Sequence, residues 1–298
     1  MILMLILLPG SMKHLQAQDY KSISAAEDTL RIIQHSIMLE KSDCEKELKN
    51  SRFESLLLKI LKLPGAGLYP FDSIKWMGRL ISPDKRFRIF NWNIPFSDGS
   101  QKYFSIIQLN QMGDKEILVR KLTDRSDSID EPEKKVLDQD QWYGALYYKI
   151  IPFETDRKRN RYLLLGWHGK DTQITQKIIE ILTIDSTSNI SFGAPLFKQY
   201  ADGQNTRIIF RFSATASMVL RYEDQRLSST GKWNPKSRLF DSETKKVMMV
   251  VCDHLIPIDP NLSGQFQFYI PSSDQSDGFK YDKGYWVFVS DIDARNKP

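Results

Sequence analysis

The chain has 298 residues, of which 41% are hydrophobic and 27% are charged, and these values are ordinary for a globular protein. The length allows one large β-rich domain or two smaller ones. The formal net charge is +5, and loss of Lys13 with a leader would make it +4, which is too small an excess to indicate nucleic-acid binding.

Residues 1–17 are predicted to be a signal peptide. Residues 2–8 form a short apolar run, Pro9-Gly10 ends it, and Ala17 can stand immediately before a cleavage site. No basic residue precedes the run, and basic residues follow where small neutral ones are usual. The run is well below the roughly 20 residues needed to span a bilayer, and no later stretch reaches that length. We therefore expect a soluble periplasmic or secreted protein with no transmembrane segment.

Residues 18–64 are predicted to form two helices that pair as an αα-hairpin. Ser24-Ala25-Ala26-Glu27 and Ser42-Asp43-Cys44-Glu45 both have the pattern of a capping box, which marks the start of a helix. Apolar residues recur at three- and four-residue steps after each box, and Pro64-Gly65 ends the second helix. The apolar stripe can dock a partner or pack on the protein itself, and we favour packing.

The apolar period changes to two after Lys75. Turn sequences rich in Ser, Pro, Asp and Gly separate the apolar segments. A four-stranded antiparallel meander is therefore expected, with strands at residues 75–81, 86–94, 102–109 and 116–122.

Residues 123–141 are predicted to be the least structured stretch, since they combine many acidic residues with few large apolar ones. A short helix around residues 131–137 fits this stretch, with Pro132 in its first turn. The stretch is also the one candidate domain boundary. We favour a long loop inside a single β-rich domain, residues 65–298, that packs with the helical hairpin as one unit.

Residues 161–182 are predicted to lie at the centre of the core. Residues 162–167 are apolar on both alternating faces, which predicts a central strand covered on both sides. His168-Gly169 then provides a turn, and Asp171 can cap a helix. A short helix is expected next, because apolar residues recur at helical spacing at Ile174, Ile178, Ile181 and Leu182.

The remainder of the chain is predicted to alternate strands and loops. A long polar loop is expected at residues 223–246, where apolar residues do not alternate. Strands are expected at residues 141–152, 207–212, 217–222, 246–252, 265–270, 279–281 and 285–289. The predicted fold class is α+β, an N-terminal αα-hairpin followed by a mostly antiparallel β-sheet system with one inserted helix.

The best cluster of potentially catalytic side chains lies at predicted strand ends, where Asp253 and His254 accompany Asp291 and Asp293. An imidazole beside carboxylates can act as a general base. The same side chains can instead cap strand ends and satisfy backbone groups of loops. We favour this second interpretation.

Trp233, Trp167 and His168 are the candidate ligand-binding residues. Indole rings can stack on sugars, and they also pack well inside β-sheets. Trp233 stands in a polar stretch and is the exposed candidate, whereas Trp167 has the pattern of a core strand and His168 follows it.

No metal site and no cofactor are predicted. The chain has 2 Cys and 4 His, and these lack the spacing of metal ligands. Asp274, Asp277 and Asp282 miss the spacing of a calcium loop and indicate a turn cluster. Cys44 and Cys252 can form a disulfide in an exported protein or stay apart as buried thiols.

Short segments spread along the chain carry a family resemblance. They are Ser82-Pro83-Asp84, Arg88-Ile89-Phe90-Asn91-Trp92, Leu165-Gly166-Trp167, Phe192-Gly193-Ala194-Pro195, Ser217-Met218-Val219-Leu220-Arg221-Tyr222, Asp253-His254-Leu255, Asp277-Gly278 and Trp286-Val287-Phe288. In these segments the chain resembles a group of uncharacterised exported proteins of the Bacteroidota. The resemblance implies export and a single-unit architecture, and it implies no particular activity.

Two functions are compatible with these patterns. The first is a non-enzymatic periplasmic or envelope protein that binds an unknown protein or glycan partner or has a structural role. The second is a hydrolase of a cell-wall or glycan substrate that uses Asp253, His254, Asp291 and Asp293. Nucleic-acid binding through the basic turn at residues 157–161 is disfavoured, because it would require a basic face that extends well past that turn.

Overall fold

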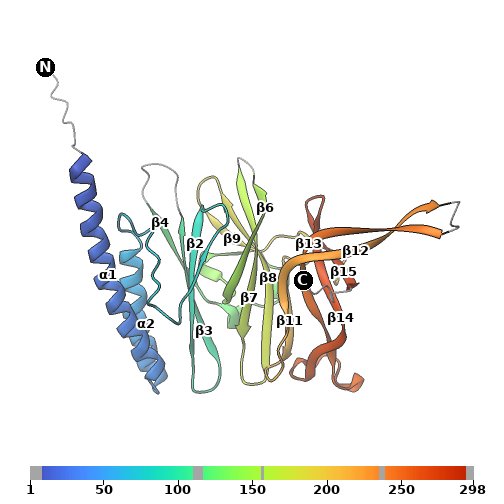
Figure 1. Cartoon of the computed structure of the whole chain (residues 1–298). Coiled ribbons are helices and arrows are strands. Elements are labelled where there is room, and N and C mark those ends of the chain that lie inside the picture. The colour runs from blue at the N-terminus through green and yellow to red at the C-terminus, as the bar shows by residue number, and fades with distance from the viewer. Residues whose placement is uncertain (1–8, 110–116, 156–157, 235–238, 293–298) are drawn as a thin grey trace. The chain divides into compact units, whose positions relative to one another are not determined.

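The computed structural model describes residues 9–109, 117–155, 158–234 and 239–292 (Figure 1). The chain divides into two compact units, of which the first holds Met1–Ser126 and Gln139–Ile150 and the second holds Asp127–Asp138 and Ile151–Pro298. The helices thus belong to the same unit as the meander and Gln139–Ile150. Within the described ranges, no helix is both long enough and apolar enough to cross a membrane.

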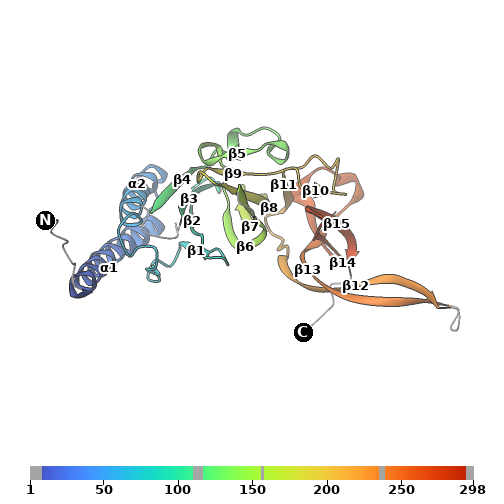
Figure 2. The ribbon, with the colours of Figure 1, turned by 90° about the horizontal axis from the view of Figure 1, so that it is seen from above.

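The first unit begins with two helices that lie side by side, as predicted (Figures 1 and 2). Helix α1 spans Pro9–Leu39 and helix α2 spans Asp43–Ile60. Ser42 caps α2, since the Glu45 backbone N–H donates to its Oγ at 3.4 Å. The predicted start at Ser24 is wrong, because α1 runs through this position. The last residue of that presumed box, Glu27, instead accepts hydrogen bonds from the Tyr69 hydroxyl at 2.6 Å and from the Ser73 backbone N–H at 2.8 Å.

The predicted four-stranded meander is confirmed, and it follows the helices in the same unit. Neighbouring strands in the chain are neighbours in the sheet, and all pairs are antiparallel. The strands are β1 (Gly78–Ile81), β2 (Phe87–Pro95), β3 (Gln101–Leu109) and β4 (Leu118–Thr123). Buried side chains of both helices and of the sheet form one core, which includes Leu30, Phe53, Leu57, Phe90 and Trp92.

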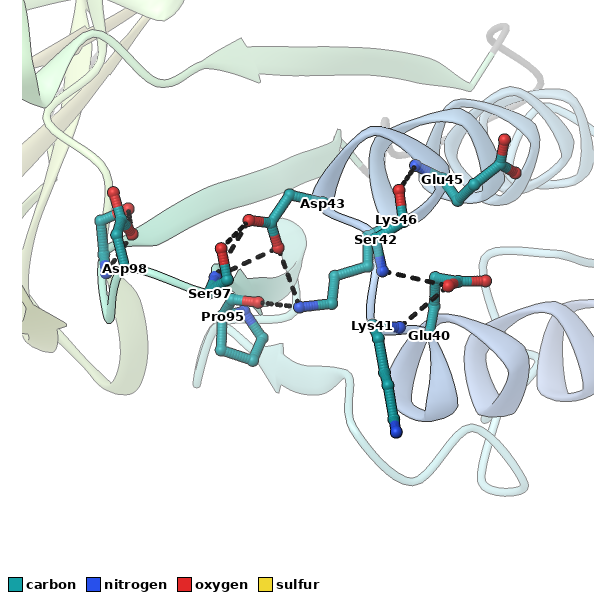
Figure 3. A network of polar contacts seen from close by, with 10 residues as sticks. Glu40, Lys41, Ser42, Asp43, Glu45, Lys46, Pro95, Ser97 and Asp98 are labelled. Carbon is teal, nitrogen blue, oxygen red and sulfur yellow. Dashed lines mark hydrogen bonds and ion pairs between the residues drawn. The ribbon is translucent and has the colours of Figure 1, made fainter.

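A polar network joins the start of α2 to the turn between β2 and β3 (Figure 3). The Asp43 carboxylate accepts hydrogen bonds from the Ser97 backbone N–H at 3.0 Å and from the Ser97 hydroxyl at 2.5 Å. Lys46 Nζ donates to the Asp43 carboxylate at 3.1 Å and to the Pro95 carbonyl at 2.7 Å. The hydrogen bonds from Ser97, and after them the one from Lys46, lower the pKa of Asp43 below its ordinary value.

The predicted loop at residues 123–141 contains only short elements. They are the 3-10 helices η1 (Ser126–Ser128), η2 (Pro132–Lys134) and η3 (Gln139–Gln141), and the strand β5 (Leu137–Asp138). Pro132 opens η2, so the expected short helix is reduced to a single 3-10 turn. The division between the units falls in this stretch, at Ser126 and again after Asp138.

The second unit contains a six-stranded sheet in the order β5-β9-β8-β7-β6, and β11 also pairs with β8. Its longer strands are β6 (Leu146–Thr155), β7 (Arg159–Gly169), β8 (Ile174–Asp185) and β11 (Arg207–Ser213), and β9 is Ile190–Phe192. The predicted central strand at residues 162–167 is confirmed as part of β7, whose residues 162–165 are all buried. The boundary between the units lies inside β6, after Ile150.

The predicted inserted helix at residues 174–182 is wrong, because this segment is strand β8. It pairs with β7 on one side and with β11 and β9 on the other, so it is covered by strands along both edges. Its isoleucines bury side chains on both faces, and β-branched residues favour such a strand over a helix. Asp171 does use its carboxylate on the backbone, as expected of a cap, but it accepts from Gln173 N and Ile174 N in a strand connection.

A second sheet in this unit has the order β10-β15-β14-β13-β12. Its strands are β10 (Phe197–Lys198), β12 (Leu220–Asn234), β13 (Leu239–Pro257), β14 (Tyr269–Asp282) and β15 (Tyr285–Ile292), and η4 (Pro260–Leu262) and η5 (Phe266–Phe268) lie between β13 and β14. Side chains of both sheets of the unit share one core, which includes Leu165, Ile179, Val250, Phe279 and Trp286.

The predicted polar loop at residues 223–246 is wrong, because most of it is paired strand. β12 and β13 form an antiparallel ribbon that extends beyond the other strands of its sheet (Figures 1 and 2). Residues 235–238, between the two strands, lie outside the described residues. The coarse fold class, α+β with a β-rich character, is confirmed, whereas the inserted helix is not present.

Candidate functional site

The predicted Asp/His cluster is only partly assembled. His254 lies inside β13, at a register irregularity between Asp253 and Leu255, and not past the strand end as expected. Its Nδ1 is 2.7 Å from Oδ2 of Asp277, and the His254 side chain is 37% exposed whereas that of Asp277 is 9% exposed. The second Asp277 oxygen accepts the Asp291 backbone N–H at 3.0 Å. The Asp277 carboxylate is thus fixed by a backbone hydrogen bond and orients the half-exposed imidazole of His254. This is the arrangement of a general base and its positioning residue.

The three predicted aspartates contribute differently. Asp253 accepts the Val219 backbone N–H at 2.7 Å, which ties β13 to the segment before β12. Asp291 contributes its backbone N–H to Asp277 and has a left-handed backbone with φ 53°. Asp293 lies outside the described residues. The carboxylate that contacts His254 therefore comes from Asp277, a residue that the sequence analysis placed in a turn.

Cys252 neighbours this pair but cannot serve it as a nucleophile. It stands directly opposite Asp277 in the strand register, and its side chain is fully buried. Burial, with the negative charges of Asp277 and Asp253, raises the pKa of the Cys252 thiol, so the reactive thiolate is disfavoured. Both Cys252 and the exposed Cys44 are free thiols, so the disulfide alternative is not realised. No group of three or more His, Cys, Asp or Glu suited to a metal ion occurs in the described part of the chain.

The candidate ligand-binding aromatic residues do not form one surface. Trp167 is half-buried in β7, and His168 beside it is only 3% exposed, so its ring is a core side chain. Trp233 lies in β12, opposite Phe240 of β13 in the ribbon. The three residues therefore belong to two different sheets.

The basic residues at the start of β7 are partly neutralised by one glutamate. Arg161 Nη1 is 2.7 Å from Oε2 of Glu154, and Arg159 Nη2 is 3.6 Å from Oε1 of the same carboxylate. Arg157 lies outside the described residues. Two arginines that share one glutamate are typical of a charged hairpin end.

A pocket in the first unit combines apolar walls with cationic groups. We call it the Arg88 pocket; its volume is about 530 Å³, which is in the range of small-molecule sites. It lies between the loop that follows α2 and the β1–β2 hairpin. Its lining residues are Gly67, Leu68, Pro70, Asp72, Arg79, Leu80, Ile81, Lys85, Arg88 and Phe90.

Arg88 distinguishes this pocket, because it is a buried cation whose partners are all neutral. The residue is 5% exposed. Its guanidinium donates to Oε1 of Gln108 at 2.9 and 2.7 Å, to the Tyr69 carbonyl at 2.7 Å and to the Ala66 carbonyl at 2.5 Å. It also lies over the Phe90 ring, 4.9 Å from the centroid. Burial lowers the pKa of Arg88 to about 10, which leaves the group charged at neutral pH.

The other cations of the Arg88 pocket are less buried. Arg79 donates from Nη1 to the carbonyls of Phe71 at 2.9 Å and Ile74 at 2.7 Å, and its Nε is 3.9 Å from the Asp72 carboxylate. Lys85 is exposed in the turn between β1 and β2. The lining thus carries three cationic side chains and one carboxylate.

A smaller pocket of about 380 Å³ lies between α2 and strands β3 and β4. Its charges are already paired, because Lys121 Nζ is 2.6 Å from Glu54 Oε2 and Lys102 forms an ion pair with Glu47. This pocket therefore has fewer unpaired charges available to a ligand than the Arg88 pocket.

Sequence reasoning missed both Arg88 and Asp277 as site residues. Arg88 stands among apolar residues of a buried strand, and an arginine in that position is the one available signal. Asp277 lies 23 positions from His254 in the chain, and only the pairing of β13 with β14 brings the two together.

No protein-family model, no curated protein and no solved structure matches this chain. The resemblance to exported proteins of the Bacteroidota therefore stays a prediction.

Proposed function

We propose that this chain is an exported, non-enzymatic binding protein of the cell envelope and that the Arg88 pocket holds its ligand. The observation that carries the proposal is a pocket of about 530 Å³ with mostly apolar walls and a buried cation among them. Ligand sites of proteins usually have this composition, with few polar groups that fix the orientation of the ligand.

The walls of the pocket are held in place before any ligand arrives. Arg79 of β1 and Arg88 of β2 donate to four carbonyl groups of the loop after α2, at Ala66, Tyr69, Phe71 and Ile74. These bonds fasten the loop to the hairpin that forms the opposite wall. A preformed site loses less conformational entropy on binding, which favours affinity.

The pocket is tested with a neutral apolar fluorescent probe, N-phenyl-1-naphthylamine. Ile81 lines the pocket from β1 and stands opposite Arg88 in the strand register, so Ile81→Trp should fill the pocket and abolish binding of the probe there. Leu48→Trp is the matched control, because Leu48 is 47% exposed on α2 and does not line the pocket. Equal probe binding by both variants would refute a ligand site at the Arg88 pocket.

Export is supported by the apolar run at residues 2–8 and by Ala17. Among the residues whose side chains are described, Ile23 is the first in the core of the first unit, so cleavage after Ala17 would leave these core residues in the protein. Mass spectrometry of the protein from fractionated cells tests the proposal. A mature N-terminus near residue 18 in the periplasmic fraction or in the medium would support it, and intact protein confined to the cytoplasm would contradict it.

A second candidate function is hydrolysis of a cell-wall or glycan substrate. The contact between His254 and Asp277 favours it, because an oriented imidazole can activate a water molecule. The purified protein would be assayed on muropeptides and glycans, with His254→Ala as the test variant. His35→Ala is the control, since His35 is exposed on α1 and belongs to the other unit. Turnover that is lost only in His254→Ala would establish the hydrolase in place of the binding protein.

A further inference from the structure

We infer that the Arg88 pocket binds a monocarboxylate carried on an apolar body, with the carboxylate against the Arg88 guanidinium. The inference rests on the proposed binding function and names the class of its ligand.

The first step is the hydrogen-bond count of the guanidinium, which has five N–H groups. Four of them donate: Nε–H and one Nη2–H to Gln108, the other Nη2–H to Ala66, and one Nη1–H to Tyr69. The second Nη1–H has no acceptor among the described residues. A buried donor without an acceptor is costly, and a ligand oxygen would remove that cost.

The second step is the charge. Gln108 and the two carbonyl groups are neutral, so the positive charge of Arg88 has no counter-ion among the described residues. The one carboxylate of the lining, Asp72, lies beside Arg79. A negative charge placed at Arg88 would form an ion pair with this buried guanidinium. Such a pair is favourable when the anion also accepts hydrogen bonds from the guanidinium.

The third step is the choice of a monocarboxylate. One open N–H and one unmatched positive charge suit a single negative charge, whereas a dianionic phosphate would bring a second charge that is costly to desolvate. Among the apolar lining residues, Phe90 lies against the guanidinium and Ile81 stands opposite Arg88 in the strand register. The others are Leu80, Pro70 and Leu68, and Leu68 and Ile81 reach the surface with exposed fractions of 93% and 60%. These walls suit an apolar chain that extends from the carboxylate toward the solvent.

The primary experiment changes the ligand and leaves the protein intact. Decanoate and decanamide have the same length and differ in charge. At pH 7, decanoate should displace N-phenyl-1-naphthylamine from the wild-type protein at a concentration about 10- to 100-fold lower than decanamide, because a hydrogen bond between charged groups contributes far more than a neutral one. Equal potency of the two compounds would overturn the inference.

The second experiment changes the protein. Arg88→Gln should bring the potency of decanoate down to that of decanamide while the neutral probe still binds. Arg88 also fastens the loop after α2, so Arg88→Gln can disrupt the pocket itself. If Arg88→Gln no longer binds the neutral probe, Lys85→Gln is tested in its place. That variant should weaken decanoate about 2- to 5-fold by removing an exposed positive charge, with Lys59→Gln on α2 as control. If neither Arg88→Gln nor Lys85→Gln lowers the potency of decanoate, the carboxylate is not bound at this pocket.

A third arm separates the two sources of such a ligand. Acetyl-trileucine with a free C-terminus and its C-terminal amide form a second matched pair. A preference for the free peptide over decanoate would indicate a peptide end, and the reverse preference would indicate a fatty acid. If the probe binds in wild type and is lost in Ile81→Trp, yet neither carboxylate displaces it, the carboxylate inference fails and the binding function stands.

Discussion

In the described part of the chain, each unit buries one arginine on a strand, and the two arginines differ in the groups that accept their hydrogen bonds. Arg207 of β11 is 0% exposed, and its Nε donates to Oε1 of Glu180 at 2.6 Å in the middle of the neighbouring strand β8. Its other nitrogens donate to the carbonyls of Pro132, Lys135 and Phe192. Arg88 of β2 has a similar set of neutral acceptors and lacks the carboxylate.

This difference distinguishes an arginine whose charge is paired inside the fold from one whose charge lies on the wall of a pocket. Arg207 and Glu180 neutralise each other, so the second unit needs no further anion at that position. Arg88 keeps an unmatched charge on the wall of a pocket. Removing one partner of a buried ion pair strongly destabilises the fold, because the other charge stays buried without a partner. Removing a buried cation that has only neutral acceptors leaves no such charge.

The largest effect is expected for Arg207→Met. The change leaves the buried Glu180 carboxylate without its cation, and the second unit should lose about 3–5 kcal/mol of stability. Hydrogen exchange of the β8 and β11 amides would measure the loss. The double variant Arg207→Met with Glu180→Leu should recover most of it, because both charges are then removed. A double variant that is no more stable than the single one would contradict the explanation.

A smaller effect is expected for Arg88→Met in the first unit. No carboxylate is left behind, and the cost is that of the unsatisfied acceptors at Gln108, Tyr69 and Ala66, about 1–3 kcal/mol. Urea unfolding followed by hydrogen exchange in β2 and β3 would measure it. Arg86→Met is the control, since Arg86 is exposed before the same strand. If Arg88→Met costs as much as Arg207→Met, the two arginines are not distinguished by their counter-ions.

The smallest effect is expected in acid, at the partly exposed Glu40 carboxylate of the first unit. Hydrogen bonds from Lys49, then from the backbone N–H groups of Ser42 and Lys41, lower the pKa of Glu40 from 4.5 to about 2 (Figure 3 shows the two backbone bonds). The unfolded chain thus binds the proton more readily than the folded one. The carboxylate therefore stabilises the fold above pH 4.5, and this contribution is lost as the pH falls toward about 2. Tm measured against pH should fall less steeply below pH 4.5 in Glu40→Gln than in Glu45→Gln, and parallel curves would contradict this.

The sequence predicted those elements in which one period dominates. The meander of the first unit has a clear period of two with turn residues between strands, and the Ser42 cap has its own local signal. Strand β8 was misread because its isoleucines also fall at helical spacing, and β-branching was the signal that separates the two structures. The β12–β13 ribbon was missed because it is held by backbone pairing between polar sequences, which carry no apolar alternation.

The candidate sites depended on contacts that are distant in the chain. Asp253 is adjacent to His254 in the chain, but successive residues of a strand point to opposite faces, so adjacency does not bring the two side chains together. Asp277 reaches His254 from the next strand, and its position follows from register alone. Arg88 could be recognised as unusual from sequence, but the absence of a counter-ion could be seen only after the fold of the described residues was known.

Arg207 donates hydrogen bonds to the carbonyls of Pro132 and Lys135, and the Thr206 hydroxyl donates to the Lys135 carbonyl at 2.8 Å. These contacts decide how the gene can be divided into fragments. Residues 127–138 belong to the second unit, although they interrupt the sequence of the first. A gene fragment that starts at Ile151 would encode every long strand after β6 and still omit the Pro132 and Lys135 carbonyl groups that accept hydrogen bonds from this buried guanidinium. The second unit made separately would need residues 127–138 joined to its N-terminus through an artificial linker, and the first would need the gap between residues 126 and 139 closed in the same way.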